Sequence, residues 1–326
     1  MKKATATAHA NIALVKYWGK RDVPLNLPEG GSISLTLEGL KTTTTVCFGE
    51  SREDLLILDG RRVIGQGLQK VLKVVDLVRR QAQLDLPVQI ESHNDFPTAA
   101  GLASSSSGFA ALTMAAAAAA GLDLSRRELS VIARQGSGSA CRSLFGGFAE
   151  WLPGDNTDGS DSHAVPLYEA DYWPMSVLIA VVNPGPKPVG STQGMQMTAS
   201  TSPYHSAFVQ QTVLDLEDAR TALAARDFGA LGQVAERSAL RMHADMMAAD
   251  PGLIYMSAHT LQVIQKVRDM QSQGMPVFFT VDAGPNVKVF CADGVQPQAA
   301  RELKQLACVQ ELLRAAPGPG ACLVDA

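Results

Sequence analysis

The fold is decided by residues 97–108, Pro-Thr-Ala-Ala-Gly-Leu-Ala-Ser-Ser-Ser-Ser-Gly, which lead directly into a run of helix formers that ends in six alanines. The small residues allow the backbone to approach a ligand closely. The first N–H groups of a helix have no partner within the helix, and the helix dipole places partial positive charge there. This stretch therefore predicts a phosphate-binding loop at the start of a helix. The residues expected to contact the phosphates are Gly101, Leu102, Ala103, Ser104, Ser105, Ser106 and Ser107.

A helix cap is the alternative interpretation of these serines. A single serine is enough to cap a helix. Four consecutive serines after Gly-Leu-Ala exceed what a cap needs, which favours the phosphate-binding interpretation. Residues 88–92, Val-Gln-Ile-Glu-Ser, alternate as a short strand before the loop, and the order strand, loop, helix is the context that a phosphate loop requires.

The composition indicates an ordinary globular protein. The chain has 326 residues, of which 46% are hydrophobic and 18% charged, so one large domain or two are both possible. Its net charge of −4 argues against a nucleic-acid partner but leaves room for an anionic small substrate bound by a local basic cluster.

The chain shows no sign of export or of a membrane span. Its first residues lack the apolar core of a signal peptide, and no apolar run reaches the roughly 18 residues that a transmembrane helix needs. The five cysteines form no C-x-x-C pair, and the six histidines show no metal-ligand spacing. We therefore expect a cytoplasmic protein with no membrane partner and no metal held by side chains.

Strands and helices alternate without a clean βαβ series, which predicts an α+β protein. Strands are expected at residues 42–48, 88–92, 176–182, 277–281 and 286–290, the last two forming a hairpin. Helices are expected at residues 66–80, 126–135, 203–225, 227–248 and 257–273. A soft boundary near residues 170–176 divides the chain into an N-terminal part, 1–174, and a C-terminal part, 175–326.

A second unusual segment is residues 11–22, Asn-Ile-Ala-Leu-Val-Lys-Tyr-Trp-Gly-Lys-Arg-Asp, which combines three cations with two large aromatic residues. In an extended chain Lys16, Trp18 and Lys20 share one face and Tyr17 lies on the other. This pattern indicates a basic rim for phosphate or carboxylate, with Tyr17 as a hydrogen-bond donor. The alternative is an edge strand protected by lysines.

Three further segments are candidates for chemistry. In residues 136–142, Gly-Ser-Gly-Ser-Ala-Cys-Arg, Arg142 is able to hold an anion with two parallel N–H bonds, or is a surface residue after a helix cap. Asp282, at the tip of the C-terminal hairpin, either accepts a proton or orients a hydroxyl, or makes only a local turn. Residues 190–195, Gly-Ser-Thr-Gln-Gly-Met, are typical of a helix start.

Taken together, these segments resemble the diphosphomevalonate decarboxylase family of the galactokinase, homoserine kinase, mevalonate kinase and phosphomevalonate kinase (GHMP) superfamily. The likeness rests on residues 11–22, 96–107, 136–142, 190–195 and 282–286, and extends to Thr201-Ser202-Pro203 and Pro317-Gly318-Pro319-Gly320. It runs from about residue 8 to about residue 320 in the same order, which makes it a specific match.

The resemblance implies a two-domain GHMP kinase-like fold with the active site in the cleft between the domains. Residues 1–174 would form a ribosomal-protein-S5-like domain and residues 175–326 a ferredoxin-like domain that contributes to a homodimer. The implied reaction uses ATP and Mg²⁺ to phosphorylate the tertiary hydroxyl of mevalonate 5-diphosphate. Loss of phosphate and CO₂ then yields isopentenyl diphosphate. Mg²⁺ would be held by phosphate oxygens and water, so no carboxylate cluster is needed.

The resemblance also implies roles for individual residues. Asp282 would take or orient the hydroxyl proton, Arg142 would bind the substrate carboxylate, and Lys16 would offset charge on the transferring phosphoryl group. Together these three are the implied catalytic residues. The implied substrate contacts are Tyr17, Trp18, Lys20, Ser137, Ser139 and Ser191.

One position departs from the family pattern. Residues 29–33 read Glu-Gly-Gly-Ser-Ile, so Gly30 and Gly31 stand where the family usually has Asn-Ser. Two alternatives therefore stay open: a decarboxylase of mevalonate 5-phosphate, and a mevalonate 3-kinase that does not decarboxylate. The set of Lys16, Arg142 and Asp282 favours a decarboxylase, because the carboxylate and the departing phosphate both need a partner.

Overall fold

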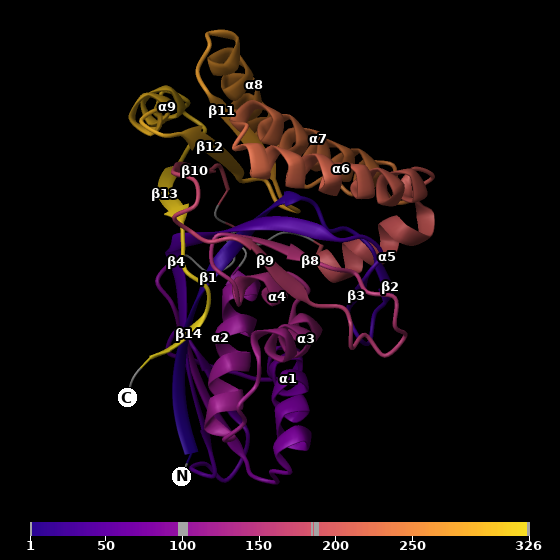
Figure 1. Ribbon diagram of the computed structural model, residues 1–326, viewed down its shortest axis with the longest axis vertical. Coiled ribbons are helices and arrows are strands. Elements are labelled where there is room, and N and C mark those ends of the chain that lie inside the picture. Colours follow the sequence, from indigo (N-terminus) through magenta and orange to yellow (C-terminus); the bar gives the residue numbers. More distant parts are fainter. Residues whose placement is uncertain (1, 97–103, 184, 186–188, 325–326) are drawn as a thin grey trace.

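The computed structural model of the chain describes residues 2–96, 104–183, 185 and 189–324 (Figure 1). The strands are β1 Lys2–Val15, β2 Lys20–Asp22, β3 Leu27–Pro28, β4 Ser32–Phe48, β5 Leu55–Leu58, β6 Arg61–Val63, β7 Val88–Asn94, β8 Phe148–Trp151, β9 Ala164–Tyr168, β10 Met175–Val181, β11 Val277–Val281, β12 Val287–Ala292, β13 Glu311–Pro317 and β14 Cys322–Val324. The helices are α1 Gln66–Ala82, α2 Ser104–Ala119, α3 Arg126–Gly136, α4 Ala140–Ser143, α5 Ser191–Thr201, α6 His205–Ala225, α7 Phe228–Met247, α8 Ala258–Ser272 and α9 Gln296–Lys304. The α+β prediction is confirmed.

In the N-terminal half, a sheet centred on β4 is covered on one face by α1, α2 and α3 (Figure 1). The long strand β4 pairs antiparallel with β1, β7 and β8, while β5 runs parallel to β7. The alanines of α2 are buried against Ala6 and Ala8 of β1. Because alanine side chains are short, α2 lies close to the sheet, and its first residue, Ser104, is carried to the end of the sheet where β7 stops.

In the C-terminal half, the antiparallel sheet β11-β12-β10-β13 has helices on both faces. Alternate residues of β10 point to opposite sides, as the pleat of a strand requires. Val177 and Ile179 join the core formed with α6 and α7, whereas Leu178 and Ala180 join the core formed with α8 and α9. The core around α6 and α7 also contains Ile12 of β1, so apolar packing connects the two halves.

The end of the chain returns to the N-terminal half. Strand β13 pairs with β10 and, through Ala316 and Pro317, with β4, which joins the two sheets. Strand β14 then pairs with residues 5–7 of β1. The division of the chain at residues 174 and 175 stays a prediction. Among the described residues, no helix combines the length and the apolar character needed to cross a membrane.

The extended segment expected at residues 11–22 is interrupted. Strand β1 ends at Val15, and β2 begins only at Lys20. Between them, Gly19 adopts φ +122°, a backbone conformation that side-chain-bearing residues rarely adopt. Lys16, Trp18 and Lys20 therefore do not share one strand face. Lys16 is 2% exposed, so it does not guard an exposed strand edge either.

Candidate active site

A carboxylate between two buried lysines forms the centre of the site. Asp282 follows directly after β11; its Oδ1 lies 2.6 Å from Nζ of Lys16, and its Oδ2 lies 3.1 Å from Nζ of Lys288. The lysine side chains are 2% and 1% exposed. Burial alone would raise the pKa of Asp282, but the two ammonium groups outweigh it and hold that pKa well below its usual range. Asp282 is therefore an anion at neutral pH.

Residues of α7 and β1 form hydrogen bonds with Lys16 and Asp282. Ser238 accepts a hydrogen bond from the backbone N–H of Lys16 at 3.0 Å, and Lys16 Nζ donates to the carbonyl oxygen of Ala13 at 2.8 Å. Nε2 of His243 lies 3.1 Å from the carbonyl oxygen of Asp282. Burial, helped by the nearby Lys16, lowers the pKa of His243 to about 4, so its ring is neutral and adds no charge.

Arg142 is the second buried cation that the sequence predicted. It lies on the short helix α4 and is 2% exposed. Its Nε donates to Oγ of Ser34 at 2.8 Å, and another guanidinium nitrogen donates to Ser32. Within the described ranges, no carboxylate forms an ion pair with Arg142, so its charge is available to an anionic ligand. The surface-residue alternative for Arg142 is wrong.

Asn11 connects Arg142 to α2, the helix that begins with Ser104. Its Oδ1 accepts from Arg142 at 3.2 Å, and its Nδ2 donates to Oγ of Ser143 at 2.8 Å and to the carbonyl oxygen of Ser139 at 2.9 Å. Its backbone N–H donates to Oγ of Ser106 at 3.3 Å. The sequence interpretation quoted Asn11 but gave it no role. An amide directly before the apolar run of residues 12–15 was the signal that it has one.

The four serines of the loop do not face the same way. Ser106 and Ser107 are fully buried, and Ser107 Oγ lies 2.7 Å from Oγ1 of Thr42. These two hydroxyls fasten α2 to the sheet and do not face an open site, which corrects the expectation for them. Ser104 and Ser105 remain open, and Ser105 Oγ lies 3.2 Å from Oγ of Ser137. Gly101, Leu102 and Ala103 lie outside the described residues.

A mainly apolar pocket adjoins the start of α2. It has a volume of about 230 Å³. Its lining includes both open serines, and the apolar walls are Leu56, Leu58, Val71, Ile90, Phe109 and Leu112. Nζ of Lys70 lies 5.2 Å from the centre of the Phe109 ring. A flat apolar group held here would place any attached phosphates at the helix N-terminus.

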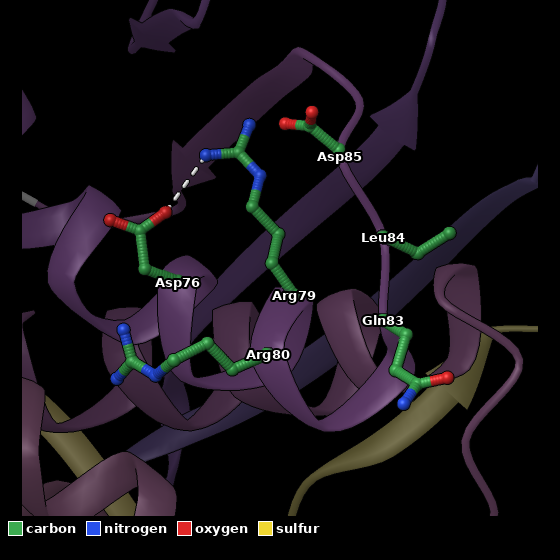
Figure 2. A pocket seen from close by; sticks show the side chains of 6 residues that line it. All are labelled: Asp76, Arg79, Arg80, Gln83, Leu84 and Asp85. Carbon is green, nitrogen blue, oxygen red and sulfur yellow. Dashed lines mark hydrogen bonds and ion pairs between the residues drawn. The ribbon is translucent and has the colours of Figure 1, made fainter.

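A second depression lies elsewhere and is not part of this site. It has a volume of about 350 Å³ and surrounds the C-terminal end of α1. Figure 2 shows that Arg79 turns toward Asp76 there, at 2.8 Å. Arg79 also pairs with Asp54, so its charge is already balanced. No residue that the sequence singled out for chemistry lines this depression.

The expected polar substrate contacts include two groups, one at the start of α5 and one beside Ser105. Lys20 donates to Oγ1 of Thr192 at 3.2 Å, next to Ser191 at the start of α5. Burial, and then Lys70 and Lys73, lower the pKa of Lys20 to about 8. Ser137 and Ser139 have their hydroxyl oxygens 3.4 Å apart.

The two aromatic residues of the segment differ. Tyr17 packs edge-on against Trp151, and its hydroxyl oxygen is covered without a partner among the described residues. Burial raises the pKa of Tyr17, so this hydroxyl remains a donor. Trp18 is 4% exposed and belongs to an apolar cluster with Met195 and Tyr255. This placement indicates packing rather than substrate contact for Trp18.

One of the two glycines that depart from the family pattern, Gly31, has a steric explanation. A Cβ added at Gly31 would lie 2.9 Å from the carbonyl oxygen of Trp151 and 3.0 Å from Leu216. A Cβ added at Gly30 would meet only Thr212, at 3.3 Å. Close packing of β8 and α6 against this loop therefore requires glycine at position 31, independently of the substrate.

The fold and this centre define the class of protein. A helix that starts with open serines lies beside an apolar pocket, and it adjoins a cluster of buried cations shared by both halves of the chain. This combination is that of a small-molecule phosphoryl-transfer enzyme of the GHMP superfamily.

Two family models cover most of the chain. The diphosphomevalonate decarboxylase-like N-terminal domain matches residues 8–164, and the mevalonate 5-diphosphate decarboxylase C-terminal domain matches residues 177–317. The chain belongs to the diphosphomevalonate decarboxylase family.

Individual relatives agree with these family models. The chain is 40% identical to the diphosphomevalonate decarboxylase of Ganoderma lucidum over 88% of this chain and 78% of the relative. It is 39% identical to that of Homo sapiens over 89% and 76%. The crystal structure of mevalonate diphosphate decarboxylase from Staphylococcus aureus superposes with a TM-score of 0.94 at 38% identity, covering 99% of this chain and 98% of that one. A structure of MDDEF in complex with MVAPP, AMPPCP and magnesium gives 0.93 at 40% identity over 99% of both chains.

Proposed function

We propose that the protein catalyses the ATP-dependent decarboxylation of mevalonate 5-diphosphate to isopentenyl diphosphate, with release of CO₂, ADP and phosphate. The observation that carries this proposal is the buried centre of Lys16, Asp282 and Lys288 beside an Arg142 that has no carboxylate partner among the described residues. A buried arginine suits any substrate with a carboxylate, and the Lys16–Asp282 pair suits phosphoryl transfer to a hydroxyl of that substrate. The relatives' names favour the diphosphate substrate over the 5-phosphate and over a 3-kinase.

Arg142 binds the substrate carboxylate. Its remaining N–H donors would form two parallel bonds to the two carboxylate oxygens, a geometry that lysine cannot supply. Ser32, Ser34 and Asn11 hold the guanidinium in place before substrate arrives, so little orientation entropy is lost on binding. Electrons left on the substrate when CO₂ departs expel the phosphate from the neighbouring carbon.

Asp282 orients the tertiary hydroxyl of the substrate. Of the two roles expected for it, orientation is favoured over proton abstraction, because two lysines stabilise its ionised form and make it a weak base. Lys16 offsets the negative charge of the transferring phosphoryl group. Such transfers depend mostly on positioning and electrostatics, so a preorganised cationic centre suits the reaction.

The nucleotide binds at the start of α2. Its base fits the apolar pocket of about 230 Å³, and its phosphates reach the helix N-terminus and the hydroxyls of Ser104 and Ser105. Among the described residues, no group of three or more histidine, cysteine, aspartate or glutamate side chains is arranged to hold a metal. The open serines at the start of α2 suit a nucleotide that carries Mg²⁺ on its own phosphates, where the ion would neutralise their charge.

Five polar residues supply the groups that would hold the 5-diphosphate of the substrate. Lys20, with a pKa near 8, and the hydroxyl of Tyr17 supply positive charge and a donor. Ser137, Ser139 and Ser191 supply hydroxyls at helix ends. Trp18 supports this surface from behind through its apolar packing.

Product analysis tests the proposal. Purified protein is incubated with ATP and either mevalonate 5-diphosphate or mevalonate 5-phosphate, and products are identified by mass. We expect ADP and isopentenyl diphosphate in equal amounts from the first substrate. ADP together with a stable phosphorylated acid would identify a kinase, and isopentenyl phosphate from the second substrate alone would identify the monophosphate enzyme.

We further propose that two copies of the chain associate through the C-terminal half and act in the cytoplasm. Exposed apolar residues of this half include Val213 and Leu214 of α6 and Leu261 of α8. Light scattering coupled to gel filtration measures the assembly; a mass of one chain at micromolar concentration would contradict the dimer.

A further inference from the structure

Lys288 lies outside the motif by which Asp282 is found in the sequence, yet it reaches the same carboxylate. It is the second residue of β12, beyond the turn that follows Asp282. Its Nζ lies 3.1 Å from Oδ2 of Asp282 and 3.4 Å from the carbonyl oxygen of Asn286. Isolating an ammonium group from water costs several kcal/mol, so a lysine that is 1% exposed needs a partner.

The strand register explains why Lys288 points at the centre. In the β11–β12 hairpin Lys288 is paired with Thr280. Directly paired residues project to the same face of a sheet, and Asp282 follows Thr280 by two residues. Thr280 Oγ1 donates to the carbonyl oxygen of Ala13 at 3.4 Å, the same oxygen that accepts from Lys16. This face therefore contacts the C-terminal end of β1, directly before Lys16.

We propose that Lys288 is a positioning residue for the reaction: it holds Oδ2 of Asp282 so that Oδ1 faces Lys16, and it leaves the cluster with a net positive charge. The inference rests on the proposed function. With Lys16 alone, the carboxylate would neutralise the cation assigned to the transferring phosphoryl group. With Lys288 present, two positive charges and one negative leave one positive charge for that group. The second contact also restrains rotation of the carboxylate, which fixes the direction in which the substrate hydroxyl is held.

A merely structural role is the competing explanation, in which Lys288 stabilises the fold and takes no part in turnover. The two explanations differ in the kcat of a folded variant. If Lys288 holds Asp282 during the reaction, a neutral replacement lowers kcat in a folded protein, leaves KM for ATP nearly unchanged, and is rescued by arginine. Loss of stability alone would leave the kcat of the folded fraction unchanged.

The experiment uses two neutral variants of different polarity, K288Q and K288M, and the charge-preserving variant K288R. Wild-type turnover of mevalonate 5-diphosphate is measured first, so that an inactive wild type counts against the proposed function and not against the role of Lys288. We expect each neutral variant to lower kcat by about 10- to 100-fold, with KM for ATP changed by less than about threefold. K288R should keep kcat within about threefold of the wild type, because it preserves the positive charge.

Circular dichroism and thermal melting identify which neutral variant is folded. A folded K288Q or K288M with wild-type kcat would overturn the proposal, whatever its melting temperature. Lys266→Met is the matched control, because it removes a partly buried lysine that pairs with Glu302 at 2.5 Å on α8 and α9. It should leave kcat unchanged.

Discussion

Four buried or partly buried charged side chains carry the proposed chemistry: Lys16, Arg142, Asp282 and Lys288. They come from the residue after β1, from α4 and from the β11–β12 hairpin, and each would be costly to bury alone. Pairing through Asp282 lowers that cost for the lysines, and hydroxyl and amide oxygens lower it for Arg142. The carboxylate and phosphates of a bound substrate would neutralise the positive charge that remains.

Replacing Asp282 tests this balance. We expect Asp282→Ala to lower kcat for isopentenyl diphosphate formation by at least about a thousandfold, because orientation of the hydroxyl and compensation of two lysines are lost together. Asp282→Asn keeps the shape and serves as the control for packing. Melting temperatures separate unfolding from loss of chemistry. Full activity in a folded Asp282→Ala variant would refute the role of this residue.

The glycines at positions 30 and 31 offer a second test at the scale of single residues. We expect Gly31→Ser to destabilise the protein by about 1–3 kcal/mol, because its Cβ would meet the carbonyl oxygen of Trp151 at 2.9 Å. Gly30→Ser should cost much less, because only Thr212 is near, at 3.3 Å. Denaturant unfolding measures both. Equal stabilities would show that packing does not require glycine at position 31.

In the first turn of α2, we expect Ser107 to stabilise the fold and Ser105 to contact the nucleotide. We expect Ser107→Ala to lower the free energy of unfolding by about 1 kcal/mol, because a buried hydroxyl 2.7 Å from Thr42 Oγ1 is lost. Ser105→Ala should leave stability unchanged and raise KM for ATP several-fold, because this hydroxyl is open. Steady-state kinetics and chemical unfolding of both variants would detect the split, and the opposite assignment of the two effects would contradict it.

The side chain of His205 forms a bridge that connects Glu29, the residue after β3, to α6 and α7. His205, the first residue of α6, has Nε2 2.8 Å from Glu29 and Nδ1 2.8 Å from Asp245 of α7. Burial alone would lower the pKa of His205, but hydrogen bonds that its ring donates to the two carboxylates raise it to about 9. A Cβ at Gly19 would lie 2.9 Å from this ring, so the bridge supports the turn between Trp18 and Lys20 from behind.

The bridge predicts a pH-dependent stability. The pKa of His205 rises from 6.5 when unfolded to about 9 when folded, so its contribution is fully present below about pH 6.5 and is lost as the pH rises through 9. At most it is on the order of 3 kcal/mol. We expect the stability difference between wild type and His205→Gln to be larger at pH 6 than at pH 9.5. Urea unfolding at both values measures this; an equal difference at both would contradict the bridge.

At the scale of the whole molecule, a shared core joins the two halves. Ile12 and Leu35 of the N-terminal sheet belong to the same buried cluster as Leu216 of α6 and Phe278 of β11. Strand β13 pairs with both sheets, and β14 ends beside β1 (Figure 1). Relative motion of the halves is therefore limited, which suits a centre whose charges come from both of them.

Cooperative unfolding follows from this shared core. We expect calorimetry to show a single transition with equal calorimetric and van't Hoff enthalpies, because neither half buries its share of the common cluster alone. A fragment of residues 1–174 should lack native near-ultraviolet circular dichroism. Two separate transitions, or a folded fragment, would show that the halves are independent.

The class of fold and the order of the main elements were predictable from residue patterns, such as the helix formers of α2 and the strand–turn–strand pattern of the β11–β12 hairpin. Lys16, Arg142 and Asp282 stood in unusual polar segments, but each had a structural alternative, and the resemblance to a known family was needed to assign them chemistry. What depends on contacts between distant segments became visible in the folded structure. It turned Ser106 and Ser107 inward, buried Trp18, required glycine at position 31 and brought Lys288 to Asp282. Strand register and packing control these outcomes, and no local pattern encodes them.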